Sequence, residues 1–165
     1  MFPYCIVASA GGTTGCVLND HMDDMPYLAL VDDDQHSAFL LTRMLLAHGS
    51  PRVQCYGCAA DGRQALADVL SDPVANWPSL IIVDLKCHSG ANLEFVGSIR
   101  ALVGQTGVPV VVMAPPLDRQ EREAFYEAGA SEVFFRHAER DAYRREAAGI
   151  VSFWARSQRL DAVGM

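Results

Sequence analysis

The chain has 165 residues, of which half are hydrophobic and a fifth are charged, and this is the size and composition of one globular domain. Its formal net charge of -7 argues against a nucleic acid or an anionic membrane surface as the main partner. No stretch approaches the roughly 20 apolar residues that span a bilayer, so we expect no membrane helix.

The start of the chain and its cysteines indicate where the protein works. Residues 1–24 contain no basic segment of the kind that begins a signal peptide, and we expect a flexible extension, although Met22 and Met25 leave open a mis-assigned start codon. The five cysteines are odd in number and scattered, which predicts reduced thiols and a cytoplasmic protein. Cys55 and Cys58 have C-x-x-C spacing, but we expect them to pack a strand end rather than form a redox or metal pair.

From Tyr27 onward, five apolar runs alternate with five segments of helical periodicity. The expected strands cover residues 27–31, 52–56, 80–83, 110–113 and 133–136. The expected helices cover residues 35–48, 62–70, 91–103, 118–128 and 141–159. These units predict the α/β class, with a flavodoxin-like doubly wound parallel sheet of five strands in the order 2-1-3-4-5 and five helices on its two faces. We expect this domain to span residues 25–160, followed by a tail at 161–165.

Acidic residues directly follow two of the expected strands. Asp32, Asp33 and Asp34 come after the first strand, and Asp84 comes after the third. In the expected order these strands are neighbours, and open α/β sheets bind their ligands at the carboxyl ends of the strands. Carboxylates this close repel one another unless a proton or a cation intervenes, and oxygen ligands suit Mg²⁺. The pattern therefore predicts a divalent cation next to a reactive carboxylate.

Several segments carry a family resemblance: LALVDDDQH at the first strand, ADGRQAL at the second helix, LIIVDLKCHSGANLEF at the third strand, VPVVVM at the fourth and AGA before the fifth. In their order and spacing, residues 27–160 resemble the receiver domain of response regulators in two-component signalling. The resemblance implies that Asp84 is phosphorylated, that Asp33 binds Mg²⁺ directly and Asp32 through water, and that the backbone carbonyl of Lys86 is a further ligand. A carboxylate can attack phosphorus, and Mg²⁺ neutralises charge on the phosphoryl oxygens.

The chain departs from the receiver pattern where receivers respond to the phosphoryl group. The usual Thr or Ser after the fourth strand is Ala114, which lacks the hydroxyl for a bond worth about 1.5–3 kcal/mol. The usual Lys at the end of the fifth strand is Arg136, and the Pro after it is His137. The aromatic switch position is Val133. A loop Pro is replaced by His88, which we expect to be a solvated residue rather than a catalytic one.

The last expected helix carries a narrower resemblance. Its segment GIVSFW is similar to stand-alone receivers that partner phytochrome-type histidine kinases, and the long loop at residues 71–78 fits the same group. Two interpretations of the aromatic pair stay open: Phe153 and Trp154 either cover the sheet and a helix edge, or form a face for a partner or a homodimer. Arginines make this helix locally basic, which is typical of a solvated face: Arg140, Arg144, Arg145, Arg156 and Arg159.

Three functions follow as hypotheses. The first is a single-domain response regulator, no enzyme beyond self-catalysed phosphoryl transfer, that accepts a phosphoryl group from a histidine kinase on Asp84 with Mg²⁺ and signals through protein contacts. The second is a pseudo-receiver that binds proteins without phosphorylation, which Ala114, Val133 and Arg136 favour. The third is a Mg²⁺-dependent hydrolase with an aspartyl nucleophile, and it is weaker because Lys86 stands where such enzymes usually carry a second Asp.

Overall fold

The computed structural model describes residues 24–163, so nearly all of the predicted N-terminal extension lies outside the described residues. Five parallel strands form one sheet in the order β2-β1-β3-β4-β5, which confirms the predicted fold class. The strands are β1 (Tyr27–Asp32), β2 (Arg52–Tyr56), β3 (Leu80–Asp84), β4 (Val110–Ala114) and β5 (Glu132–Phe135). The helices are α1 (Gln35–Ala47), α2 (Ala59–Ser71), α3 (Ala91–Thr106), α4 (Arg119–Ala128) and α5 (Arg140–Val163).

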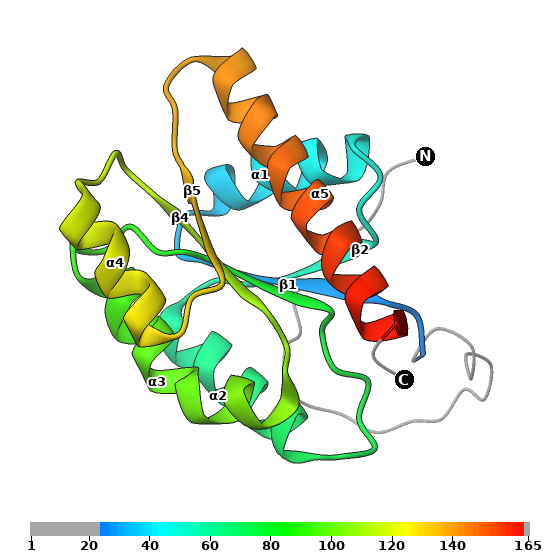
Figure 1. Ribbon diagram of the computed structural model, residues 1–165. Coiled ribbons are helices and arrows are strands. Elements are labelled where there is room, and N and C mark those ends of the chain that lie inside the picture. Colours follow the sequence, from blue (N-terminus) through cyan, green and yellow to red (C-terminus); the bar gives the residue numbers. More distant parts are fainter. Residues whose placement is uncertain (1–23, 164–165) are drawn as a thin grey trace, which may run out of the picture.

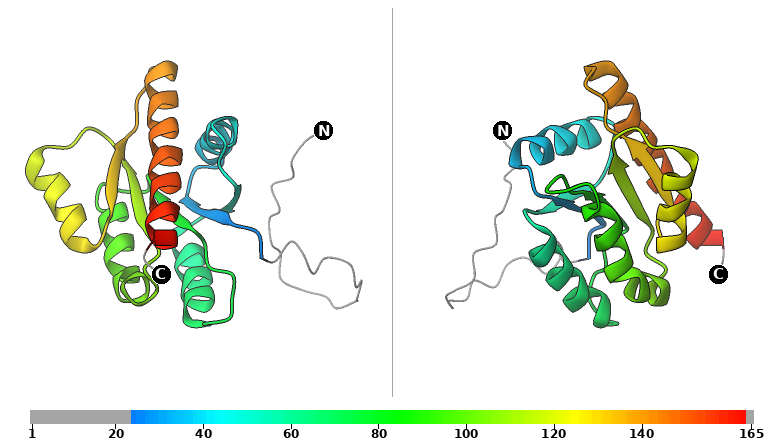
Figure 2. Two further views of the ribbon diagram at one scale, coloured as in Figure 1. Left: turned by 45° about the vertical axis from the view of Figure 1, so that its right-hand side comes forward. Right: turned by 90° about the vertical axis from the view of Figure 1, so that its left-hand side faces the viewer.

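Helices cover both faces of the sheet, with α1 and α5 on one face and α2, α3 and α4 on the other (Figures 1 and 2). Because side chains alternate along a strand, β1 contributes to both layers. Leu28 and Leu30 pack with α1 and α5, whereas Ala29 and Val31 pack with α2 and α3. Every residue of β1, β3 and β4 is buried, as is typical of strands covered on both faces. In the described part of the chain, no helix has the length and apolar character to cross a membrane.

Local side chains determine where two of the helices begin. Asp34 caps α1, because its carboxylate accepts a hydrogen bond from the Ser37 N–H at 3.0 Å. Cys58 caps α2, because its sulfur accepts a backbone N–H of the first turn. This cap starts α2 at Ala59, earlier than the sequence predicted. One member of the C-x-x-C pair therefore has a structural position at a helix start.

Other element ends differ modestly from the prediction. α3 continues to Thr106, where Gly107 ends it with a left-handed backbone (φ 74°). α5 continues to Val163, into the segment that was predicted to be a tail. β5 ends at Phe135, which places Arg136 just beyond the strand rather than at its last position. The Arg136 N–H still donates to the Ala114 carbonyl at 2.8 Å, so the chain stays next to β4 at this point.

Candidate functional site

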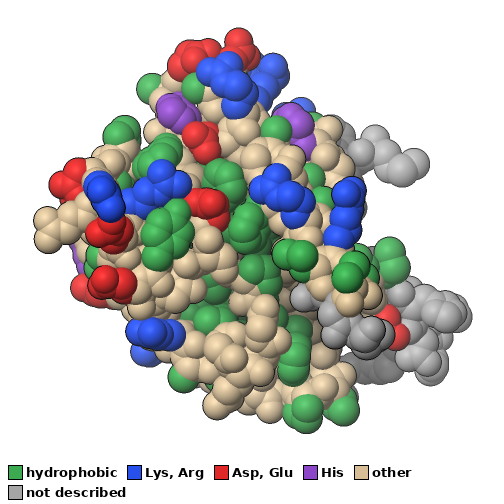
Figure 3. All heavy atoms as spheres, viewed as in Figure 1, with side chains coloured by type: hydrophobic (Ala, Val, Ile, Leu, Met, Phe, Trp, Pro, Cys, Tyr) green, Lys and Arg blue, Asp and Glu red, His purple; other side chains and the backbone are tan. Residues whose placement is uncertain are grey.

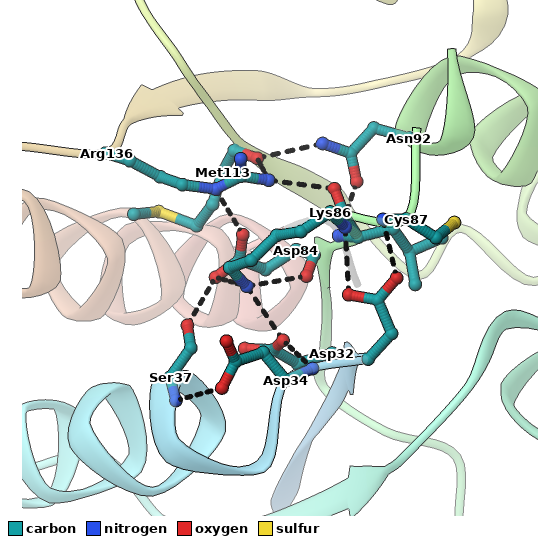
Figure 4. Close-up of polar contacts among 11 residues, drawn as sticks. Asp32, Asp34, Ser37, Asp84, Lys86, Cys87, Asn92, Met113 and Arg136 are labelled. Carbon is teal, nitrogen blue, oxygen red and sulfur yellow. Dashed lines mark hydrogen bonds and ion pairs between the residues drawn. The ribbon is translucent and has the colours of Figure 1, made fainter. Parts of the chain in front are cut away.

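The pairing of the two central strands brings the predicted acidic residues together. In the register of β1 and β3, Asp32 lies opposite Asp84. Both side chains are fully buried at the carboxyl end of the sheet, where they converge with basic side chains from two loops (Figure 4). Asp33 follows Asp32 and accepts hydrogen bonds from the loop after β3. The structure thus gathers the carboxylates that the sequence had placed at neighbouring strand ends.

The ammonium group of Lys86 lies between the two buried carboxylates (Figure 4). Its Nζ is 2.8 Å from Asp32 Oδ1 and 3.1 Å from Asp84 Oδ2, and it also donates to the Asp84 carbonyl at 3.0 Å. The side chain is 25% exposed, so it reaches the two buried carboxylates from the surface. Sequence analysis gave a role only to the backbone carbonyl of Lys86 and missed its amine.

Arg136 binds Asp84 from the other side. Its Nε donates to Asp84 Oδ1 at 2.5 Å. Its Nη2 donates to the carbonyl oxygens of Leu85 and Met113 at 2.9 and 3.1 Å. The guanidinium therefore neutralises the carboxylate and also joins the ends of β3 and β4, because its donors point in several directions from one rigid plane.

Asp33 is engaged by the backbone of the loop after β3. Its Oδ1 accepts the Lys86 N–H at 2.9 Å and its Oδ2 accepts the Cys87 N–H at 2.8 Å. Burial acts to raise the pKa of Asp33, but these hydrogen bonds outweigh it, and the pKa lies below its ordinary value. Asp33 is consequently ionised at neutral pH and holds the loop that carries Lys86.

Asp32 is in the opposite situation. Burial raises the pKa of its carboxyl group above the ordinary value, even though Lys86 and the Asp34 N–H act to lower it. Its Oδ1 accepts from both of these groups, with the Asp34 N–H at 2.9 Å. Its Oδ2 is buried and has no hydrogen-bond partner among the residues that the structure describes. An oxygen of this kind makes the ionised form unfavourable, because nothing replaces the water that burial removed.

Two hydroxyl groups near Asp84 were missed by the sequence analysis. Ser37, in the first turn of α1, donates to Asp84 Oδ2 at 3.4 Å. Tyr143 comes from α5, and burial, followed by the negative charge of Asp84, raises its pKa to about 12. Tyr143 therefore stays protonated at neutral pH. No spacing in the sequence connects these residues, because each comes from a different helix.

Asn92 ties together the strand ends beneath the site. It is buried at the start of α3, where its Oδ1 accepts the Leu85 N–H at 2.7 Å and its Nδ2 donates to the Met113 carbonyl at 3.0 Å. Both bonds reach backbone groups that follow or end the central strands. Asn92 thus fixes the spacing of β3 and β4 where Asp84 and Arg136 meet.

Comparison with known proteins gives structural matches only. No family model matches the chain, and neither does any curated protein. The phosphorylated cyanobacterial phytochrome response regulator RcpA is similar with a TM-score of 0.63 and 20% identity, over 79% of this chain and 94% of that one. The Mn²⁺-bound form of the response regulator Rcp1 gives 0.59 and 19% over 79% and 94%, and a response regulator receiver domain from Rhodospirillum rubrum gives 0.61 and 17% over 78% and 93%. This chain has the receiver fold.

At two of the positions that depart from the receiver pattern, Ala114 and Val133, the side chain supplies no group in place of the usual one. Ala114 is buried at the end of β4 and offers no hydroxyl to the site. Val133 is buried in the core layer on the side of α3 and α4. As a valine, it has no aromatic ring that could move. His88 is an exposed loop residue whose Nε2 lies 3.6 Å from Glu94, as expected for a solvated side chain.

At the Mg²⁺ site that the resemblance implies, the acidic side chains already have other partners. Lys86 Nζ lies between Asp32 and Asp84, and both oxygens of Asp33 accept backbone N–H groups. Within residues 24–163, no group of three or more His, Cys, Asp or Glu side chains is arranged to hold a metal ion. Lys86 and Arg136 balance the two buried carboxylates. This arrangement does not fit Mg²⁺, and Mg²⁺ binding stays a prediction.

The aromatic pair of α5 contacts the body of the receiver fold. Trp154 and Phe153 are partly buried against the core layer on the side of α1, and the indole N–H of Trp154 donates to Ser79 Oγ at 2.9 Å. This favours packing over a partner face for Trp154. At the start of α5, acidic and basic side chains lie side by side (Figure 3), and Arg144 is 3.8 Å from Asp141. The helix is therefore less basic there than its arginines alone suggest.

Proposed function

We propose that this chain is a single-domain response regulator whose Asp84 accepts a phosphoryl group from the phosphohistidine of a histidine kinase. The observation that carries the proposal is the surroundings of Asp84, a carboxylate at the end of the central strand with Lys86 and Arg136 against its two oxygens. Cationic donors already in place stabilise the charge of a transferred phosphoryl group. The similarity to RcpA, a phosphorylated phytochrome response regulator, supports a phytochrome-type kinase as the partner.

In the proposed step, an oxygen of Asp84 attacks phosphorus, so that an O–P bond forms while the N–P bond of phosphohistidine breaks. The product is an acyl phosphate, and the leaving imidazole nitrogen takes up a proton from solvent. Oδ1 is held by Arg136 at 2.5 Å, whereas Oδ2 has longer contacts of 3.1 Å to Lys86 and 3.4 Å to Ser37. Oδ2 is therefore the attacking oxygen. Because Asp84 is fully buried, the partly exposed Lys86 side chain must first move aside.

Magnesium stays a proposed cofactor of this function. The resemblance implies Asp32, Asp33, Asp84 and the backbone carbonyl of Lys86 as its ligands, and the similar Rcp1 structure is a Mn²⁺-bound form. In the described arrangement the Lys86 amine would have to leave the space between Asp32 and Asp84 before a divalent cation could enter. When bound, the ion would neutralise charge on the phosphoryl oxygens.

Intact-protein mass spectrometry after incubation with phosphoramidate, with and without Mg²⁺, tests the proposal. We expect one phosphoryl mass that hydroxylamine removes, as for an acyl phosphate, and that Asp84→Asn abolishes. The matched control is Asp68→Asn, which changes an exposed carboxylate of α2 and should leave the mass gain intact. A gain that persists in Asp84→Asn would contradict the proposal. So would the absence of any gain from both phosphoramidate and a phosphorylated histidine kinase.

The second candidate is a pseudo-receiver that binds a protein partner without phosphorylation. It is favoured by Ala114, which has no hydroxyl, and by Asp84, whose two oxygens are already occupied by ion pairs. A folded protein that binds a histidine kinase but takes no phosphoryl group from it would support this function. A homodimer and a cytoplasmic location stay predictions, and sedimentation of the purified protein would test the first.

A further inference from the structure

Lys86 is the only lysine among the 165 residues, and its amine lies at the most acidic point of the sheet. Nζ has three oxygen neighbours at 2.8 to 3.1 Å, which are Asp32 Oδ1, Asp84 Oδ2 and the Asp84 carbonyl. Carboxylate and carbonyl oxygens at one point are the surroundings that hard cations take in proteins. In this chain the cation at that point is covalently attached.

We propose that the Lys86 ammonium is a tethered cation, which occupies the space between Asp32 and Asp84 in the resting protein and competes there with divalent cations. The proposal concerns the unphosphorylated protein, so it does not depend on whether Asp84 accepts a phosphoryl group. The position of Lys86 differs from that of Arg136, which binds the opposite oxygen of Asp84 and two backbone carbonyls. Lys86 is the group that bridges the carboxylates of Asp32 and Asp84 (Figure 4).

The loop that carries the amine is held in place. Asp33 accepts the N–H groups of Lys86 and Cys87 with its two oxygens, at 2.9 and 2.8 Å. The Lys86 backbone therefore stays close to Asp32 and Asp84 even when the side chain moves. Without the amine, the buried carboxylates of Asp32 and Asp84 would repel each other. Within the described part of the chain, Oδ2 of Asp32 already has no hydrogen-bond partner.

Because Lys86 belongs to the same chain as the carboxylates, its competition with a divalent cation is intramolecular. The apparent affinity for the cation is therefore lowered by the same factor at every protein concentration. A divalent cation binds only those molecules in which the Lys86 side chain has left the space between Asp32 and Asp84. If that state is about 10% populated or less, the apparent affinity falls about tenfold or more below that of a chain without the amine.

Calorimetric titration of Mg²⁺ into the full unphosphorylated chain tests this inference. The variants are Lys86→Met, which keeps an unbranched apolar stem, and Arg119→Met as the matched control. Both remove one positive charge, but Arg119 lies on the exposed face of α4 beside Glu123 at 2.9 Å. We expect Lys86→Met to bind Mg²⁺ about tenfold more tightly, or more, than wild type and Arg119→Met do. Equal affinities of wild type and Lys86→Met would overturn the inference.

A second measurement needs no variant, should Lys86→Met fail to fold. Labelling with ¹⁵N-lysine gives a single side-chain ammonium signal, because the chain has one lysine. We expect relaxation of that signal to show an ammonium group as ordered as the backbone, since three oxygens hold it. A freely mobile ammonium would overturn the inference. Neither measurement uses a phosphodonor, so the outcome is separate from that of the phosphorylation test.

Discussion

Replacement of Arg136 by lysine tests whether the guanidinium shape, rather than its charge alone, holds the site together. Arg136 donates to Asp84 Oδ1 at 2.5 Å and to the Leu85 and Met113 carbonyls at 2.9 and 3.1 Å. A lysine has the same charge, but its donors radiate from a single nitrogen. We therefore expect Arg136→Lys to keep the ion pair with Asp84 and to lose at least one bond to a carbonyl.

The size of the effect follows from that loss. A hydrogen bond that involves a charged group contributes about 1.5–3 kcal/mol, and we expect the free energy of unfolding to fall by this amount. The Met113 carbonyl retains the Nδ2 of Asn92 as a donor, so the loss bears mainly on the Leu85 carbonyl. For a domain of this size the corresponding fall in Tm is about 3–12 °C.

Thermal and urea unfolding, followed by circular dichroism, measures this difference. Arg119→Lys is the control, because the Arg119 side chain is 93% exposed and its ion pair with Glu123 lies on the surface. We expect this control to stay within about 0.5 kcal/mol of wild type. Equal stability of Arg136→Lys and the control would refute the view that the three contacts of Arg136 are made together.

Two other substitutions have expected signs that the structure determines. Gly62→Ala should destabilise the protein by about 1–3 kcal/mol, because its Cβ would lie 2.9 Å from both methyl groups of Val31. Gly97→Ala, in an open position of α3, should instead stabilise the protein by about 0.5–1 kcal/mol. Urea unfolding measures both variants, and a change in the free energy of unfolding with the same sign for both would contradict this. Asp32→Asn should raise the Tm at neutral pH. Burial raises the pKa of Asp32 in the folded protein, so the wild type loses stability as the pH rises from the ordinary value of 3.8 through the native pKa. Asp32→Asn lacks this carboxyl group, and we expect thermal melts across that pH range to show no such loss for the variant.

The order of elements and the position of the acidic residues could be predicted from local patterns. Apolar runs such as Leu80 to Val83 indicate strands buried on both faces. Helical periodicity between these runs indicates that helices connect the strands, which makes neighbouring strands parallel. Once the strand order is known, carboxylates at the carboxyl ends of β1 and β3 must meet, as Asp32 and Asp84 do. The boundaries were less predictable, because the start of α2 depends on a cap formed by Cys58.

The direction of long side chains is what only the tertiary structure decided. Lys86 and Arg136 are far apart along the chain, and each could extend into solvent from its loop. They turn inward because the folded sheet buries two carboxylates that need counter-charges. The electrostatic attraction between these groups arises only once the sheet has formed. The same holds for Asn92, whose two bonds join the backbone of Leu85, directly after β3, to that of Met113 in β4. Sequence by itself determined the scaffold and its carboxylates, because these follow from local periodicity, whereas the folded structure determined which groups neutralise them.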